Sequence, residues 1–176
     1  MNITVIGAGA MGSLFGALLA EAGKTGLVLA MQNGMGNTDT LAEILEPSQI
    51  IAGTTSHGAT FLGPGTIRHA GEGDTVIGPW STAGMTGAEK VAEVFHRANI
   101  VTRVVVDVRT VLWEKLLINV GINAITALAG IKNGQILQLE WSRRLSREAV
   151  EEAMADGKVS ALDIIQAKKT VENGSW

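Results

Sequence analysis

The sequence contains no cysteine among its 176 residues, which excludes disulfide bonds and thiolate metal sites. Its three histidines, His57, His69 and His96, do not have the spacing of metal ligands, so we predict no metal site. A strong positive charge is also absent, because the formal net charge is −3. This charge balance argues against a nucleic-acid backbone or an anionic membrane as the main partner.

Long uninterrupted apolar runs are lacking as well. No apolar run reaches the length that spans a membrane without a polar interruption. The first residues enter a β-branched segment directly, without the basic stretch and cleavage site of a secretory signal. Hydrophobic residues make up 46% of the chain and charged residues 18%, which is enough apolar material for a core. We therefore expect a cytoplasmic protein that binds neither membranes nor nucleic acid.

Glycine, in contrast, is abundant, with 22 residues, and three of them form a GxGxxG pattern near the start. Residues 2–6 are predicted to form a strand and residues 13–22 a helix that ends at Gly23. Between a strand and a helix, this pattern lets a pyrophosphate approach the backbone and the free N–H groups of the helix. We therefore predict contacts with a dinucleotide cofactor from the loop residues Gly7, Ala8, Gly9, Ala10, Met11 and Gly12.

The residue that distinguishes NADPH from NADH is missing from its usual place. A second strand normally ends in an acidic residue that binds the ribose, or leads to a basic residue that binds a 2′-phosphate. Here a predicted strand over residues 27–31 runs into a turn over residues 32–37. No Asp, Glu or Arg lies between Lys24 and Thr38, so both dinucleotides remain open at this point.

The remaining segments predict an α/β fold, with a Rossmann-type domain over residues 1–106 and a helical domain over residues 107–176. In the first domain we expect a helix at 39–45, a strand at 49–55, an antiparallel hairpin of strands 66–69 and 75–78, a helix at 86–98 and a strand at 101–106. Val91, Val94 and Phe95 should face inward from the helix at 86–98. In the second domain we expect helices at 112–129, 137–154 and 160–171, with Asp107 as an N-cap.

The helix predicted over residues 112–129, LWEKLLINVGINAITALA, is the most apolar in the chain and should be buried. Lys115, Asn119 and Asn123 are spaced four residues apart, so they form one polar stripe along this helix. Burying these groups without partners is costly. The stripe therefore either lines a cleft that binds polar ligand groups or forms a structural network between two packed helices.

Several motifs occur in an order that resembles ketopantoate reductase, also called 2-dehydropantoate 2-reductase. The motifs are GAGAMG at 7–12, QNGMGN at 32–37, TTSHGA at 54–59, PGTIRHAGEGDTVIG at 64–78 and LWEKLLINVGINAITAL at 112–128. The resemblance implies a Rossmann domain, a helical domain and an active site between them. It also implies the reduction of ketopantoate to pantoate with NADPH, on the route to pantothenate and coenzyme A.

The same resemblance implies roles for individual residues. Lys115 matches the family's catalytic lysine, Asn119 and Asn123 match asparagines that hold the substrate, and Asn33 matches an asparagine near the nicotinamide and the substrate. The chemistry agrees, because an ammonium group can stabilise the charge that hydride transfer leaves on a ketone oxygen and can deliver the proton. His57 and His69 lie in family motifs, but we expect a turn or interface residue and a hairpin residue rather than proton donors.

The sequence departs from the family in length. Between Gly23 and Leu27 the family has further strands and helices, and it continues beyond the C-terminal helices seen here. We therefore expect open sheet edges at the strands 2–6 and 27–31. We also expect a longer parent protein, with a protein that has lost these segments as the alternative. Three other functions stay open: a related 2-oxoacid or hydroxyacid dehydrogenase, a non-catalytic nucleotide-binding remnant, and a purely structural α/β domain. A helical second domain is compatible with a homodimer.

Overall fold

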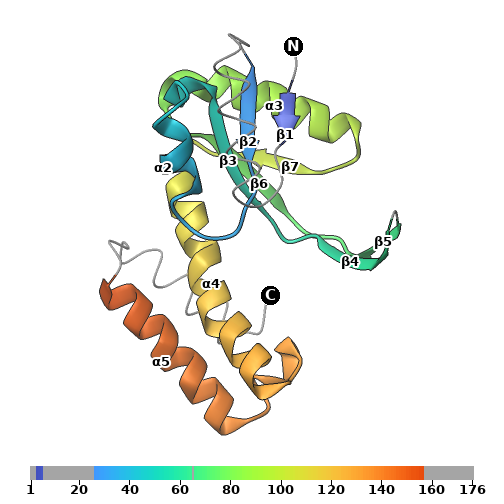
Figure 1. The fold of residues 1–176 in the computed structure, drawn as a ribbon, viewed down its shortest axis with the longest axis vertical. Helices are drawn as coiled ribbons and strands as arrows, with labels where there is room; N and C mark the ends of the chain where they lie inside the picture. Colours follow the sequence, from blue (N-terminus) through green and yellow to red (C-terminus); the bar gives the residue numbers. More distant parts are fainter. Residues whose placement is uncertain (1–2, 6–25, 65, 157–176) are drawn as a thin grey trace. The chain divides into compact units, whose positions relative to one another are not determined.

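The computed structural model describes residues 3–5, 26–64 and 66–156 (Figure 1). The contacts between residues divide the chain into two units, Met1–Val111 and Leu112–Trp176. The first unit contains a sheet with helices and the second is helical, which confirms the predicted α/β fold class. The predicted helices at 13–22 and 160–171 lie outside the described residues.

The first unit is built on a five-stranded sheet with the order β1-β2-β3-β6-β7. The first three strands are parallel, β6 is antiparallel to β3, and β7 is parallel to β6. Every described residue of β2 after the first is buried, as expected for a strand with neighbours on both sides. The strands are β1 (Ile3–Val5), β2 (Leu27–Ala30), β3 (Ile50–Thr55), β6 (Thr75–Pro79) and β7 (Thr102–Val104).

The strand order corrects the expectation of two open edges. β1 ends the sheet in the part of the chain that the structure describes, so an open edge at the first strand agrees with the prediction. β2 lies inside the sheet, where Val28 pairs with Thr4 of β1 and with Ile50 of β3. The prediction was therefore wrong for the second strand, because β1 and β3 supply the neighbours that it needs.

Helix α3 (Met85–Arg97) packs on this sheet and forms the main core with it. Val91 is buried and Phe95 packs against the core, as predicted, whereas Val94 is 38% exposed. The inward residues follow the i, i+3, i+4, i+7 spacing of one helical face, and Val94 lies beside that face. The buried members of the core are Leu29, Ile51, Ile77, Ala88, Val91 and Ala92.

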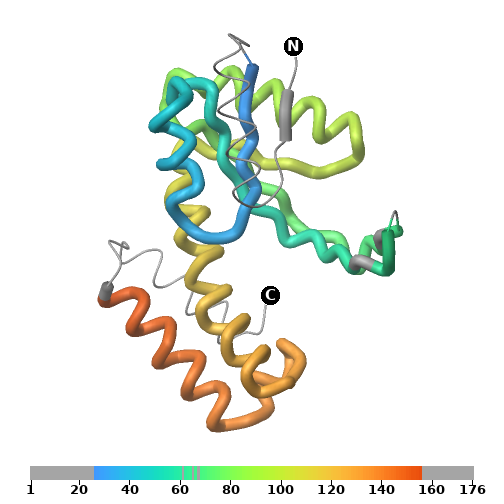
Figure 2. The backbone as a smooth tube through the Cα atoms, in the orientation of Figure 1, coloured from blue at the N-terminus to red at the C-terminus, as the bar shows by residue number. Residues whose placement is uncertain are grey.

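A separate two-stranded ribbon, β4 (Gly58–Gly63) and β5 (Thr66–Gly71), extends from the main sheet (Figure 2). The predicted hairpin between 66–69 and 75–78 is therefore wrong, because β5 pairs with β4 and β6 pairs with β3. The pairing of β3 with β6 continues past its last strand residues, where the Ser56 N–H donates to the Asp74 carbonyl at 2.9 Å. Residues 72–74 thus return the chain to the main sheet rather than turning a hairpin.

Short helical segments connect the strands. Helix α2 (Asn37–Ala42) begins earlier and ends earlier than predicted, and the single turns η1 (Pro47–Gln49) and η2 (Thr82–Gly84) precede β3 and α3. Gly84 packs closely there, because a Cβ atom would lie 2.8 Å from the Ser48 carbonyl oxygen.

Helix α4 (Val108–Ala129) starts at the predicted N-cap. Asp107 Oδ1 accepts hydrogen bonds from the backbone N–H groups of Arg109 at 3.1 Å and Thr110 at 3.4 Å. The Thr110 hydroxyl donates to Asp107 Oδ2 at 2.7 Å and is the main cause that lowers the pKa of this carboxyl group. The Arg109 guanidinium also lies 3.7 Å from the centre of the Trp80 ring and donates to the Trp80 carbonyl.

The second unit is held together where α4 meets α5 (Glu140–Asp156). Ser146 Oγ donates to the Gly121 carbonyl at 2.6 Å, and Leu117 and Val150 are buried together. A Cβ atom at position 121 would lie 3.0 Å from both Ser146 Oγ and Val150 Cγ2, so glycine allows this approach. The turn η3 (Asn133–Gln135) lies between the two helices in sequence.

Helix α4 is less buried than its composition predicts. Only 28% of its most apolar 18-residue window is buried, and Leu128 is 89% exposed. By length and composition alone, α4 could cross a membrane, but the core helix of a soluble protein passes the same test. The expectation of a buried helix is therefore wrong for the part of the chain described here.

Candidate functional site

The loops that can hold a ligand lie at one edge of the sheet, where β1, β2 and β3 end. β1, β2 and β3 are parallel, so their carboxyl ends lie at the same edge, and β6 and β7 begin there because they run the other way. Ligands of open α/β sheets bind outside the carboxyl ends of the strands. The turn after β2 and the segment after β3 are thus the places to look for a site.

The turn after β2 contains the predicted cofactor and substrate residue Asn33. Gly34 and Gly36 have φ values of 90° and 89°, in the left-handed region that favours glycine. The Asn33 carbonyl accepts from the side chain of Asn37 at 3.4 Å, where α2 begins. The Asn33 residue itself is exposed at the edge of the sheet, where its side chain can meet a ligand.

The neighbouring Gln32 carries a buried polar atom. Among the residues that the structure describes, its Oε1 is the only buried side-chain nitrogen or oxygen without a hydrogen-bond partner. Such an unsatisfied group costs about 1–3 kcal/mol. Gln49, in contrast, donates from Nε2 to the Gly26 carbonyl at 3.2 Å. Sequence reasoning passed over Gln32, since burial of one amide oxygen leaves no sequence signal.

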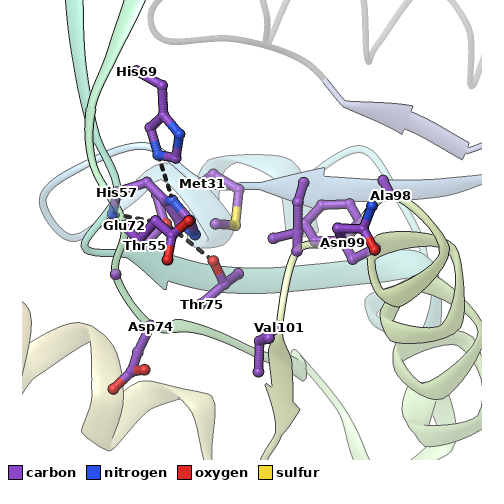
Figure 3. Close-up of a pocket in the computed structure, with 13 residues that line it drawn as sticks. Met31, Thr55, His57, His69, Glu72, Asp74, Thr75, Ala98, Asn99 and Val101 are labelled. Carbon is purple, nitrogen blue, oxygen red and sulfur yellow. Dashed lines mark hydrogen bonds between the residues drawn. The ribbon is translucent and has the colours of Figure 1, made fainter.

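A pocket of about 960 Å³ lies at the same edge of the sheet (Figure 3). It combines an apolar side, with Met31 and Phe95, and a polar side, where the hydroxyls of Thr55 and Thr75 lie 3.0 Å apart. Among the described residues, the predicted site residues Asn33, Lys115, Asn119 and Asn123 do not line it. The polar and charged lining residues also include His57, His69, Glu72, Asp74 and Asn99.

Two histidines meet on the wall of this pocket. His57 Nδ1 and His69 Nε2 lie 2.9 Å apart and form a hydrogen bond, with the ring centres 5.1 Å apart (Figure 3). The backbone N–H of His57 also donates to Thr55 Oγ1 at 3.3 Å. The pair therefore ties β5 to the segment that follows β3. This contact could not be expected from the predicted strands, because β4 was not among them and its pairing with β5 brings the two rings together.

The predicted polar stripe lies on α4 in the second unit. Lys115, Asn119 and Asn123 follow one another at one-turn spacing on this continuous helix. Lys115 and Asn119 are half-buried and Asn123 is exposed. The predicted cofactor loop, residues 7–12, lies outside the described residues. Within the described ranges, no group of three or more potential ligands could hold a metal ion.

The strand arrangement and the helical second unit define the chain as an α/β protein of the Rossmann type. Residues 24–82 match the family described as Ketopantoate reductase PanE/ApbA, and residues 107–173 match its C-terminal part. The chain belongs to the ketopantoate reductase family, which confirms the resemblance in its sequence motifs.

Curated relatives carry the same family name. The 2-dehydropantoate 2-reductase of Halobacterium salinarum is 37% identical over 141 residues, which cover 80% of this chain and 46% of the relative. The enzyme of the same name from Pyrococcus abyssi is 36% identical over 129 residues, covering 73% of this chain and 42% of the relative. The chain thus spans about half the length of the curated relatives that it matches, in agreement with the expected departure in length.

Solved structures confirm the fold. A PanE/ApbA family ketopantoate reductase from Ralstonia eutropha has a TM-score of 0.75 and 28% identity, covering 97% of this chain and 58% of that one. A complex of D-mandelate dehydrogenase with NADH has a TM-score of 0.84, covering 98% of this chain and 59% of that one. Its sequence identity is 16%, so this second likeness concerns the fold alone.

Proposed function

We propose that the protein reduces 2-dehydropantoate to pantoate with NADPH, as a cytoplasmic enzyme of pantothenate and coenzyme A biosynthesis. Family membership carries this proposal, since curated relatives at 34–37% identity are named 2-dehydropantoate 2-reductase. The chain also has a lysine and two asparagines at one-turn spacing on α4, which suits a substrate with a ketone, a carboxylate and a hydroxyl.

The described residues fit a nicotinamide dinucleotide at the sheet edge. The left-handed glycines after β2 let a ligand approach the backbone, and Gln32 Oε1 is an acceptor without a donor. We assign pyrophosphate binding to the loop Gly7–Gly12, and nicotinamide and substrate contacts to Asn33. The dinucleotide, when bound, supplies the hydride.

In this proposal Lys115 is the catalytic residue. Its ammonium group stabilises the negative charge that develops on the ketone oxygen and then gives that oxygen a proton. Asn119 and Asn123 donate or accept hydrogen bonds through their amides and orient the substrate. Asn33 orients it from the turn after β2.

The test is an assay of NADPH oxidation by the purified protein in the presence of 2-dehydropantoate. The loss of the absorbance of the reduced nicotinamide measures the rate. We expect turnover that depends on this substrate and exceeds the turnover with 2-oxoacids that lack its hydroxymethyl group. Faster reduction of another 2-oxoacid would instead identify a related 2-oxoacid dehydrogenase. NADH in place of NADPH, at matched concentrations, gives the cofactor preference.

A second candidate is a nucleotide-binding protein without catalysis, because the matched residues account for only part of each relative. The match covers 46% of the relative from Halobacterium salinarum. Binding of NADPH with no turnover of any 2-oxoacid would support this alternative.

A further inference from the structure

The first turn of α4 is fixed to the sheet of the first unit by two side chains. Val108 is 1% exposed and packs on Gly78 of β6, where a Cβ atom would lie 2.9 Å from Val108 Cβ. The Arg109 Nη1 donates to the carbonyl of Trp80 at 3.3 Å, and its Cζ lies 3.7 Å from the centre of the Trp80 ring. Trp80 follows β6, is buried and donates its N–H to the Ile50 carbonyl of β3.

The contacts of Arg109 fix an orientation as well as a position. A guanidinium is planar and carries its donors in a rigid fork. Stacking on a ring while donating to the carbonyl of the same residue leaves this group little freedom. An apolar contact such as that of Val108 allows a helix to turn about its axis, whereas a stacked and hydrogen-bonded guanidinium opposes such a turn. Arg109 therefore sets the rotation of the first turn of α4.

The same helix carries the proposed proton donor. α4 is continuous from Val108 to Ala129, so Lys115 follows Arg109 after six residues, about 9 Å along the axis. Six steps of about 100° place Lys115 about 120° round the helix from Arg109. A rotation of about 10° moves a group that lies about 5–6 Å from the axis by about 1 Å. A displacement of about 1 Å can lower the rate of a reaction by about 10²-fold.

We propose that Arg109 is a positioning residue that aims the ammonium group of Lys115. Its guanidinium holds Trp80 and thereby holds the rotation of α4, and the backbone hydrogen bonds of the helix carry that rotation to Lys115. The inference rests on the proposed function, in which Lys115 gives a proton to the ketone oxygen. A purely structural Arg109 would stabilise the fold and have no specific link to proton delivery.

The variants remove the contact in two degrees. Arg109→Met keeps an apolar stem but loses the charge and the donors. Arg109→Lys keeps a charge that can lie over the ring but loses the planar fork. Arg103→Met, at an exposed arginine of β7, is the matched control.

The experiment is a double-mutant cycle in the full chain. Arg109→Met is made in the unchanged protein and in Lys115→Ala, and kcat with 2-dehydropantoate and NADPH is measured for all four proteins. If Arg109 acts through Lys115, the two substitutions are not additive. Titration with NADPH and thermal unfolding accompany each variant. Arg109→Lys takes the place of Arg109→Met in the cycle if the methionine variant is unfolded at the assay temperature.

We expect Arg109→Met to lower kcat by about tenfold to 10²-fold and to leave the Kd for NADPH within about twofold. Arg109→Lys should recover part of this loss, and Arg103→Met should leave kcat unchanged. In Lys115→Ala the further substitution Arg109→Met should change kcat by less than about twofold, because the group that Arg109 aims is gone. An equal loss of kcat in both backgrounds, or normal kcat in Arg109→Met, would overturn the inference.

A distance measurement distinguishes failure of the inference from failure of the proposed function. The chain contains no cysteine, so spin labels can be attached to Lys90→Cys on α3 and Lys115→Cys on α4 alone. Arg109→Met should broaden the distribution of distances between the labels, and Arg103→Met should not. An unchanged distribution would overturn the inference whatever the substrate. Absence of 2-dehydropantoate turnover in the unchanged protein, together with the broadened distribution, would overturn the proposed function alone.

Discussion

Gly53 of β3 illustrates how closely single residues fit in the sheet. A Cβ atom at this position would lie 2.6 Å from the Val76 carbonyl oxygen and 2.7 Å from Ile77 Cγ2. The Gly53→Ala variant must therefore push β6 away, and we expect it to lower the free energy of unfolding by about 1–3 kcal/mol. Urea denaturation measures the change. Gly71→Ala in β5 is the matched control, because no heavy atom lies within 4 Å of the added methyl group.

Equal losses of stability in both variants would contradict this packing argument. At the same scale, patterns along the chain single out candidate residues, whose roles stay predictions. Asn33 stands out by its Gln-Asn-Gly turn, and the stripe of Lys115, Asn119 and Asn123 by its spacing. Gln32 and the pair of His57 and His69 could not be found in this way, because burial and the contact between two strands decide what they do.

The start of α4 is an element that the sequence predicted from local chemistry. Asp107 accepts hydrogen bonds from two backbone N–H groups of the first turn. Asp107→Ala should therefore reduce the free energy of unfolding at neutral pH by about 1 kcal/mol. Asp107→Asn keeps an acceptor at the same position and should lose less. Chemical denaturation of both variants and the unchanged protein measures the difference, and equal losses would rule out a capping role.

The same cap predicts a dependence on pH. Hydrogen bonds from Thr110 lower the pKa of Asp107 in the folded protein below its ordinary value of 3.8. The ionised carboxylate thus stabilises the fold fully above that value, and the contribution is lost as the pH falls toward the folded pKa. The stability advantage over Asp107→Asn should be constant near neutral pH and shrink below about pH 4. An advantage that grows in acid would contradict this assignment.

The ribbon β4–β5 shows why other elements could not be predicted. Residues 66–69 and 75–78 are close in sequence and separated by glycines, so a hairpin between them is the local expectation. β6 instead pairs with β3, which lies about twenty residues away and offers a buried apolar strand, Ile50–Ala52. Which strand pairs with β6 depends on all the strands of the sheet, so it cannot be predicted from the turn residues next to β6 alone.

At the scale of the molecule, the order of the sequence motifs was enough to recognise the family. The activity stays a proposal, because the chain spans only about half the length of its curated relatives. The two family matches fall in different units of the chain, residues 24–82 in the first and most of 107–173 in the second. Cofactor binding and proton delivery are thus proposed for residues that lie far apart in sequence. Losing the proposed proton donor should therefore not disturb the turn that we propose holds the dinucleotide.

Lys115→Ala therefore separates the two functions. If Lys115 delivers the proton, kcat with 2-dehydropantoate should fall by about 10²-fold to 10⁴-fold, the usual contribution of a positioned acid. The Kd for NADPH should stay within about twofold, because the lost charge acts on the ketone oxygen during the reaction and is not needed to bind the cofactor. Lys90→Ala, an exposed lysine on α3, is the control and should leave both quantities unchanged. Near-normal kcat in Lys115→Ala, or a loss of NADPH affinity as large as the loss of kcat, would remove Lys115 from the catalytic role.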